Sequence, residues 1–324
     1  MADMEYRPLG DSGLMVSAVG VGCNAFGRRV DADGVRDVLD AATDVGVTLL
    51  DTADIYGDPA GGSETLMGEF FAAHPGRRDD FVLATKFGMD MRGAYGDDHG
   101  VRGSRRYVRR AVEESLRRLQ TDHIDLYQLH EPDPITPVEE TLSVLTDLVQ
   151  EGKVLYLGSS NVAGWQVADA EWTSRSAGLE RFVSVQNRYS LLDRTIESEV
   201  VPACEEYGLG VLPFFPLEYG LLTGKYRRGE TAPAGSRATS APSPWLEDAD
   251  WDRIEAVEAF AAERDLDPID VAIAGLAAQP AVTSVIAGAT SGDQVRRNAA
   301  TLRWEPSEDD LVALDEATGA SSDD

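Results

Sequence analysis

Four polar side chains at the ends of predicted strands have the types needed for proton transfer to a carbonyl oxygen. They are Asp51, Tyr56, Lys86 and His130. In parallel α/β proteins, active sites are built on the loops that leave the carboxyl ends of strands. Each side chain alone has a structural explanation, as a turn cap, a loop aromatic or a surface charge. The combination points further, because neighbouring strands of a barrel bring such positions together at its mouth.

These four side chain types suit the reduction of a carbonyl group. A tyrosine hydroxyl with an ordinary pKa of about 10 is a poor proton donor at neutral pH. A lysine ammonium beside it favours the phenolate, and an aspartate keeps that ammonium charged and in position. A histidine can donate a hydrogen bond that polarises the carbonyl oxygen. Because no side chain can supply a hydride, the chemistry requires a cofactor.

Eight alternations of strand and helix position these residues. Apolar runs predict the strands 18–22, 47–50, 81–85, 124–129, 154–157, 182–185, 210–214 and 283–286. Helical periodicity and capping signals predict helices at 31–45, 63–72, 104–119, 137–149, 164–175, 196–207, 251–264, 268–278, 293–301 and 308–317. Segments 6–9 and 15–17 predict a hairpin ahead of the main fold.

The predicted fold class is therefore α/β, a (β/α)8 TIM barrel with an N-terminal β-hairpin and extra C-terminal helices. Residues 1–324 form a single predicted domain, since no linker or repeat divides the chain. Gly20, Gly22 and Ala25 also match the loose dinucleotide-binding fingerprint. That fingerprint should open a helix, whereas the next predicted helix begins only at Asp31, so a Rossmann turn is disfavoured.

Composition restricts the partners and the compartment. No apolar run approaches the roughly 18 residues of a membrane span, and the first ten residues lack a signal-peptide core. Cys23 and Cys204 are the only cysteines, which suits the reducing cytoplasm. The formal charge of −28 predicts no binding to nucleic acid or anionic membranes. An anionic ligand would need specific arginines or lysines, and Lys86, Lys153 and Lys225 are the only lysines.

The ordered motifs along nearly the whole chain resemble the aldo-keto reductase superfamily. Within that superfamily, the sequence is most similar to the branch of bacterial reductases related to potassium-channel β-subunits, and the similarity is clearest at residues 130–140. The segments that carry the resemblance are 7–17, 51–57, 63–64, 84–86, 129–130, 158–161, 220–225 and 294–298. The resemblance implies that Asp51, Tyr56, Lys86 and His130 form a catalytic tetrad with Tyr56 as the general acid.

The same resemblance implies NADPH as the cofactor, with NADH as the alternative, and no metal. The implied cofactor contacts are Gly22, Cys23, Asn24, Asp51, Ser160, Asn161, Gln186, Phe214, Phe215, Pro216, Leu217, Glu218, Lys225, Arg237, Gly288, Thr290, Gln294, Arg297 and Asn298. The basic residue that often pairs with the adenosine 2′-phosphate is missing at 288, 290 and 294, which leaves Arg237 and Lys225 as substitutes. Phe214 stands where the family often stacks a tyrosine or tryptophan on the nicotinamide.

The resemblance implies a small-molecule carbonyl substrate, but neither its identity nor the oligomeric state. The segments that set substrate choice in the family carry Met89, Met91, Tyr95, Tyr219, Trp245 and Trp304 here. Two alternatives remain open: an NAD(P)-dependent aldose or alcohol dehydrogenase, and a cofactor-binding sensor or regulatory subunit with little turnover. A metal-dependent hydrolase is disfavoured by the placing of the four histidines, and a serine hydrolase by the lack of a Gly-x-Ser-x-Gly elbow.

Overall fold

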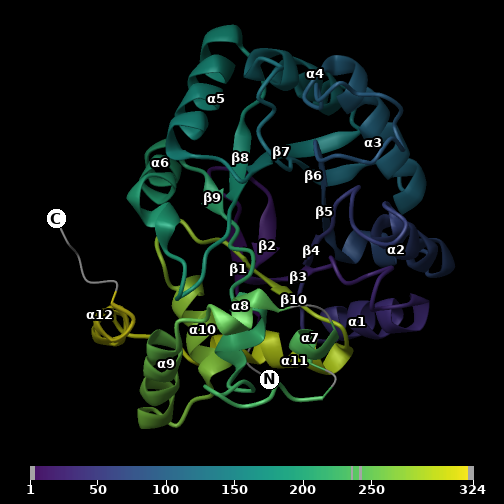
Figure 1. Cartoon of the computed structure of the whole chain (residues 1–324). Helices are drawn as coiled ribbons and strands as arrows, with labels where there is room; N and C mark the ends of the chain where they lie inside the picture. Colours follow the sequence, from purple (N-terminus) through teal and green to yellow (C-terminus); the bar gives the residue numbers. More distant parts are fainter. Residues whose placement is uncertain (1–3, 235, 241–242, 320–324) are drawn as a thin grey trace.

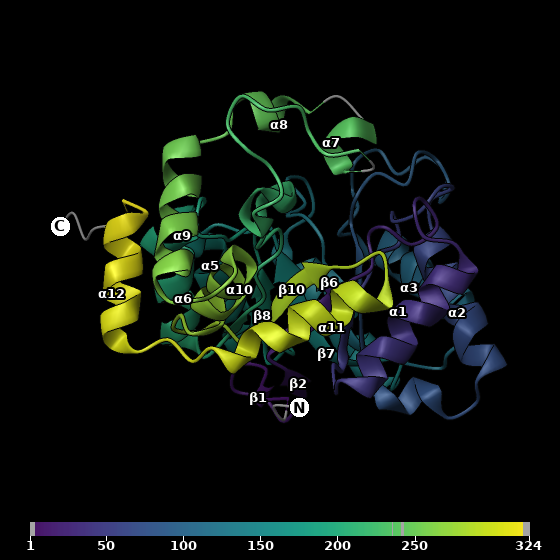
Figure 2. The same cartoon turned by 90° about the horizontal axis from the view of Figure 1, so that it is seen from below.

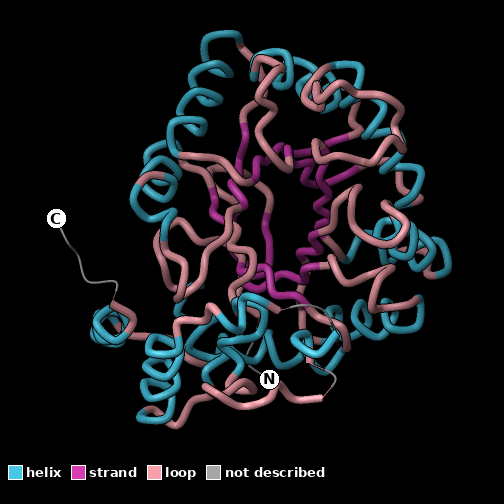
Figure 3. The backbone as a smooth tube through the Cα atoms, in the orientation of Figure 1, coloured by secondary structure: helices cyan, strands magenta, loops and turns pink. Residues whose placement is uncertain are grey.

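The structure, a computed structural model, describes residues 4–234, 236–240 and 243–319. Eight parallel strands form one curved sheet enclosed by helices (Figure 1, Figure 3). In spatial order they are β10 (Val285–Gly288), β3 (Val19–Gly22), β4 (Leu49–Asp51), β5 (Val82–Phe87), β6 (Ile124–Leu129), β7 (Val154–Ser160), β8 (Phe182–Gln186) and β9 (Gly210–Val211).

The two outer strands of this order approach each other and close the barrel. Strand β9 stops at Val211, shorter than predicted, because Pro213 has no backbone N–H to donate to a ladder. The chain stays extended, and Phe214 still forms a parallel bridge with Ile286. The Ile286 N–H donates to the Pro213 carbonyl at 2.9 Å, and the Thr283 N–H donates to the Val211 carbonyl at 2.9 Å. The prediction of a (β/α)8 barrel is confirmed.

The helices lie outside the strands, close to their predicted bounds. They are α1 (Ala32–Asp44), α2 (Gly62–Ala73), α3 (Arg105–Leu119), α4 (Val138–Gln150), α5 (Gly164–Ala177), α6 (Val200–Tyr207), α7 (Arg237–Ser240), α8 (Pro244–Glu247), α9 (Trp251–Glu263), α10 (Pro268–Ala277), α11 (Gly292–Ala300) and α12 (Glu308–Ala317). Short 3-10 turns are η1 (Arg77–Asp80), η2 (Thr195–Ser198), η3 (Glu218–Thr223) and η4 (Thr301–Arg303).

One predicted helix, 196–207, is divided into η2 and α6. Pro202 explains the division, since a proline inside a continuous helix would remove a hydrogen bond. In the observed arrangement Pro202 lies in the first turn of α6, where its missing N–H has no helical partner to lose.

The barrel interior is layered, with apolar side chains below and polar ones toward the carboxyl ends of the strands. Leu49, Ala84 and Leu126 belong to one buried cluster, and the residues two positions later are Asp51, Lys86 and Gln128. Because side chains two apart in a strand share a face, the period of two places these polar groups at the barrel mouth.

The predicted hairpin is present as β1 (Tyr6–Pro8) and β2 (Met15–Ser17). Leu9, Leu14 and Val16 join the apolar cluster inside the barrel, so the hairpin covers the end opposite the polar layer. Arg7 attaches it to the outer structure, donating to the carbonyls of Ala277 at 2.6 Å and Val282 at 3.1 Å.

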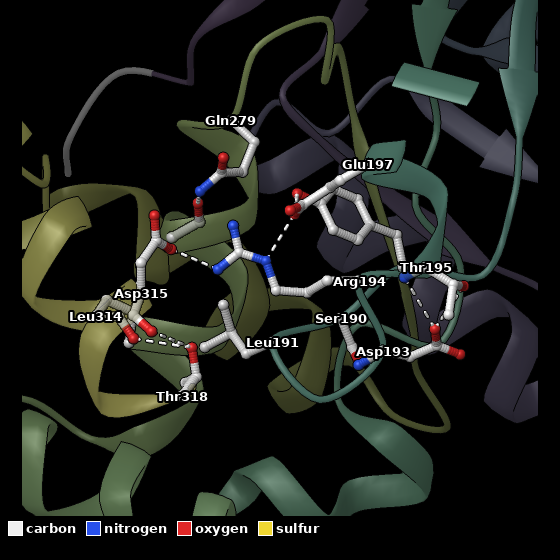
Figure 4. Close-up of polar contacts among 12 residues, drawn as sticks. Ser190, Leu191, Asp193, Arg194, Thr195, Glu197, Gln279, Leu314, Asp315 and Thr318 are labelled. Carbon is white, nitrogen blue, oxygen red and sulfur yellow. Dashed lines mark hydrogen bonds and ion pairs between the residues drawn. The ribbon is translucent and has the colours of Figure 1, made fainter. Parts of the chain in front are cut away.

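The C-terminal helices pack on one side of the barrel, where α12 lies beside α9 (Figure 2). Arg194, just before η2, links this side to the barrel: it donates to Glu197 at 2.6 Å and forms an ion pair with Asp315 of α12 (Figure 4). The nearby Ser190 donates to Glu218 at 2.7 Å, so the same segment supports a wall of the cavity described below. Among the described residues, no helix is both long enough and apolar enough to span a membrane.

Candidate active site

A buried ion pair between Lys86 and Asp51 forms the centre of the polar layer. Lys86 Nζ lies 2.5 Å from Asp51 Oδ2 and also donates to the Thr52 carbonyl at 3.0 Å. The other carboxylate oxygen of Asp51 accepts from Gln186 Nε2 at 2.8 Å and from Gln128 Nε2 at 3.1 Å. Donors on both oxygens hold the carboxylate in one orientation, which in turn fixes the ammonium.

Gly158 makes room for this arrangement. It pairs in register with Gln128 across β6 and β7. A Cβ at position 158 would lie 2.6 Å from Ser184 Oγ and 3.0 Å from Gln128 Cγ. Any side chain there would push Gln128 away from Asp51.

Tyr56 and His130 lie next to the ion pair. Lys86 Nζ is 5.1 Å from the centroid of the Tyr56 ring, and the Tyr56 and His130 rings meet edge to face with centroids 5.7 Å apart. The Tyr56 carbonyl accepts from the N–H groups of Gly61 and Ser63, both at 3.1 Å, which anchors the loop that carries the phenol. The structure therefore brings together all four side chains of the predicted tetrad.

Burial determines the protonation states in this group. It raises the pKa of Tyr56, an effect that the nearby Lys86 ammonium opposes, so the phenol keeps its proton at neutral pH. For Lys86, burial acts to lower the pKa, but Asp51 and Tyr56 outweigh it and the pKa is raised. Burial, reinforced by the charge of Lys86, lowers the pKa of His130 to about 3, which makes its imidazole neutral.

The His130 ring can donate to a ligand in the cavity. Its backbone N–H donates to the Phe87 carbonyl at 2.7 Å, and its carbonyl accepts from Asn161 Nδ2 at 3.0 Å. Nδ1 is buried and has no hydrogen-bond partner in the described part of the chain. A proton on Nδ1 would be buried and unsatisfied, so the tautomer with the proton on Nε2 is favoured, leaving Nε2–H for a carbonyl oxygen.

A cavity of about 740 Å³ opens above this polar layer. Its walls come from the loops at the carboxyl ends of the strands and from the segments around η3 and α11. Of the predicted site residues, those that line it are Gly22, Asn24, Asp51, Tyr56, His130, Ser160, Asn161, Gln186, Phe214, Phe215, Pro216, Leu217, Glu218, Lys225, Gly288, Thr290, Gln294 and Asn298. Lys86 is not among the lining residues; it is fully buried and paired with Asp51, which does line the cavity.

The polar groups on one side of the cavity fit a carboxamide. Ser160 Oγ donates to the Gln186 carbonyl at 2.7 Å. The amide nitrogens of Asn161 and Gln186 are used inside the protein. Their amide oxygens have no hydrogen-bond partner among the described residues, so both are available to accept from the NH₂ of a nicotinamide. A Cβ at Gly288 would meet nothing within 4 Å, which is open space of the kind a nucleotide needs.

The part of the cavity wall formed by residues 214–220 contains a strained loop, which Glu218 holds in place. Phe215, Glu218 and Tyr219 have φ of 57°, 43° and 57°, the left-handed region that residues other than glycine seldom adopt. The buried Glu218 carboxylate pairs with Arg188 at 2.5 Å and accepts from Ser190 at 2.7 Å. Such strain is typical of ligand-binding segments whose surroundings hold them in place.

Three predicted cofactor contacts do not appear in the cavity wall. Cys23 is fully buried, because its side chain turns into the apolar core, where Sγ lies 3.5 Å from the Val21 carbonyl. Arg297 turns instead toward α10, donating to Asp270 at 2.6 and 2.9 Å and to Asp267 at 2.8 Å. Arg237 begins α7, but its side chain lies outside the described part of the structure.

The residues predicted on the substrate side are divided between the cavity and the core. Met89 and Tyr219 line the cavity, and Trp245 stacks on Tyr219 with ring centroids 5.3 Å apart. Trp245 itself is not a lining residue. Met91 and Tyr95 are buried in the core, and Trp304 packs against Phe260.

Some residues of the site were not predicted from the sequence. Gln128 holds Asp51, and its signal was available: it lies two residues before His130, on the same face of the strand. The lining residues that were not predicted are Ala25, Arg29, Gly220, Thr223, Ser236, Ile269, Ile286 and Ala289. Of these, Arg29 carries a full charge.

The fold is a parallel barrel, and a lysine–aspartate pair, a tyrosine and a histidine lie together at its mouth. The model of the Aldo/keto reductase family matches residues 18–318. The chain belongs to the aldo/keto reductase family, whose members generally use NAD(P)H. This membership supports carbonyl reduction in general and makes the chain an oxidoreductase.

Similar proteins match this chain over most of its length. The oxidoreductase YrpG of Bacillus subtilis is 38% identical over 296 residues, covering 90% of this chain and 89% of the relative. A probable voltage-gated potassium channel subunit beta of Oryza sativa is 33% identical over 306 residues, covering 92% and 91%. The L-glyceraldehyde 3-phosphate reductase of Escherichia coli is 33% identical over 315 residues, covering 92% and 88%.

Proposed function

We propose that this chain is an NADPH-dependent reductase that converts aldehydes or ketones to alcohols, with Tyr56 as the general acid. The observation that carries the proposal is the grouping of Tyr56, His130 and the Lys86–Asp51 pair at the floor of one cavity. A bound reduced nicotinamide would supply the hydride.

Each residue of this group has a defined task. The neutral His130 ring donates a hydrogen bond to the carbonyl oxygen and orients it toward Tyr56. Tyr56 gives its phenolic proton to that oxygen as negative charge develops. The phenolate that remains is stabilised by the Lys86 ammonium, which Asp51 keeps in position.

The residues that would hold the cofactor surround this floor. Asn161 and Gln186 present amide oxygens to the carboxamide, and Phe214 offers an aromatic face for the nicotinamide. Lys225 is a cation in the wall formed by the 214–225 segment and would lie against the pyrophosphate. Arg237 remains the proposed contact of the 2′-phosphate, which is the basis for preferring NADPH over NADH.

The test is the oxidation of reduced nicotinamide by the purified protein, with NADPH and NADH compared and a panel of reactive aldehydes and ketones as substrates. Removing a general acid costs about 100- to 10,000-fold in rate. Tyr56→Phe should therefore lose at least about 100-fold in kcat while its NADPH Kd, measured by fluorescence titration, stays near that of the wild type. Comparable kcat values in the two proteins would refute the assignment of Tyr56.

The same experiment separates the remaining candidates. Tight NADPH binding without turnover would favour a cofactor-binding sensor, a role consistent with the similarity to a potassium channel subunit. Faster oxidation of alcohols than reduction of carbonyls would favour a dehydrogenase. We also propose a small-molecule substrate, no nucleic-acid or membrane partner, and a cytoplasmic location, on the basis of the charge and cysteine content of the chain.

A further inference from the structure

Arg29 is a cation in the wall of the cavity. Its side chain is exposed and lines the same space as Tyr56 and His130. Its guanidinium has no hydrogen bond or ion pair with any described residue. The chain has 57 acidic residues, and most of its arginines are bonded to a carboxylate or a carbonyl. A guanidinium that lines a cavity and has no partner among the described residues is therefore a candidate binding group.

The backbone around Arg29 is fixed to the loop that carries Tyr56. The Asp58 N–H donates to the Gly27 carbonyl at 3.0 Å, and Arg28 Nε donates to the Gly57 carbonyl at 3.2 Å. Gly27 has φ of +70°, and a Cβ there would lie 3.0 Å from the Gly62 carbonyl carbon. The close contact of these two loops holds the start of the Arg29 side chain at a set place relative to the phenol.

The described carboxylates that line the cavity are paired with cations other than Arg29. Among the described lining residues, the carboxylates are Asp51 and Glu218. Asp51 is neutralised by Lys86, and Glu218 by Arg188. The second lining cation, Lys225, comes from the 214–225 segment, the wall assigned to the pyrophosphate. Arg29 comes from the loop after β3, which packs on the loop of the proposed general acid.

We propose that Arg29 binds an anionic group of the substrate, so that the preferred substrates are aldehydes or ketones that carry a carboxylate or a phosphate away from the carbonyl. This inference rests on the proposed reductase function. The planar guanidinium matches both groups with paired N–H donors. Because the whole protein repels anions, the recognition depends on this local cation.

The experiment compares matched substrates in wild type, Arg29→Gln and Arg29→Lys. For the carboxylate, 4-formylbenzoate is compared with its methyl ester. For the phosphate, glyceraldehyde 3-phosphate is compared with glyceraldehyde. Arg106→Gln is the control, since Arg106 is also exposed and has no side-chain partner among the residues that the structure describes, but lies on α3 outside the cavity. Thermal unfolding of each variant checks that it folds.

We expect the ratio of kcat/KM for the anionic substrate to that for the neutral one to fall roughly 10- to 100-fold in Arg29→Gln, the loss typical of a charge-assisted hydrogen bond. Arg29→Lys should retain part of the ratio, and Arg106→Gln all of it. A loss confined to one pair identifies the anion as carboxylate or phosphate. Equal losses for anionic and neutral substrates, or a loss of NADPH affinity as large as the loss of kcat/KM, would overturn the proposal.

A binding measurement keeps this test independent of turnover. Calorimetric titration of 4-formylbenzoate and its methyl ester into the protein with NADP⁺ should show tighter binding of the anion in wild type only. If wild type binds both equally, the role of Arg29 is refuted even when the Tyr56-dependent reduction is present. If neither aldehyde is reduced but the anion preference is present and depends on Arg29, the reductase function fails while the anion site stands.

Discussion

Burial decides the charge of the side chains at the floor of the cavity. It raises the pKa of Tyr56 and lowers that of His130, so both rings are neutral at physiological pH. A neutral tyrosine still holds the proton that the proposed mechanism requires it to donate. In that mechanism the Lys86 ammonium would stabilise the phenolate once the proton has left.

These protonation states predict a flat pH profile for carbonyl reduction. The pKa of His130 is lowered to about 3, so its imidazole gains a charge only in acid. The pKa of Tyr56 is raised, so the phenol loses its proton only above its ordinary value of about 10. With a substrate that does not titrate, kcat/KM should be constant between about pH 6 and 9. An inflection near pH 6.5 that disappears in His130→Gln would contradict this.

Asp54, two residues before Tyr56, is a fully buried carboxyl group, and no cation among the described residues forms an ion pair with it. Burial, reinforced by the neighbouring Glu64, raises its pKa well above the ordinary value. Between the unfolded and folded pKa values, the native state binds one more proton than the unfolded chain. The contribution of Asp54 to stability is therefore lost as pH rises through that window.

We expect Asp54→Asn to remove this pH dependence. The free energy of unfolding of wild type should fall relative to that of the variant as pH rises above about 4. The difference should grow by up to about 1.4 kcal/mol per pH unit. Urea unfolding at several pH values measures the difference, with the exposed Asp58→Asn as control. Parallel curves for Asp54→Asn and wild type would mean that Asp54 is ionised in the native protein.

At the scale of elements, a polar contact joins α11 to α10. Arg297 of α11 pairs with both acidic residues at the start of α10. The resemblance to known reductases implied a cofactor contact for Arg297, and that remains a prediction. The ion pairs give Arg297 a second expected role, that of holding two helices together.

Arg297→Ala should therefore lower stability and leave cofactor affinity almost unchanged. Because the pair is partly exposed, the expected loss in the free energy of unfolding is about 1 kcal/mol. Chemical unfolding and NADPH titration measure the two quantities, with the exposed Arg296→Ala as the matched control. A large loss of NADPH affinity without a loss of stability would restore Arg297 to the cofactor site.

At the scale of the whole molecule, the strong negative charge opposes the compact state. The formal charge of −28 produces repulsion between surface carboxylates that salt screens over about 10 Å at 0.1 M. Many arginines form exposed ion pairs, which contribute little individually. Repulsion should outweigh these pairs in low salt.

We therefore expect the unfolding temperature to rise by several degrees between about 0.05 and 0.5 M NaCl. Calorimetry measures the shift, and an uncharged osmolyte at matched osmolality controls for preferential exclusion. A constant or falling unfolding temperature would show that the ion pairs dominate over the net charge.

The sequence alone was enough to predict the barrel and the grouping of Asp51, Tyr56, Lys86 and His130 at its mouth, because both depend on short-range patterns. Apolar runs set the strands, and side chains two apart share a face, so Asp51 and Lys86 follow Leu49 and Ala84 into the barrel interior. The position of His130 just after β6 follows from the same pattern. Strand ends could be located to within three residues, and the largest differences are at β7, which runs longer than predicted, and at β9, which Pro213 shortens.

Only the tertiary structure decided which way several side chains turn and what charge they carry. Cys23 faces the core, Arg297 faces α10 and Arg29 faces the cavity, although all three lie at loops or helix faces that sequence spacing leaves open. The neutral states of His130 and Tyr56 depend on burial by segments far apart in the chain. Contacts of this kind have no local pattern, since they arise when loops from different strands meet at the mouth of the barrel.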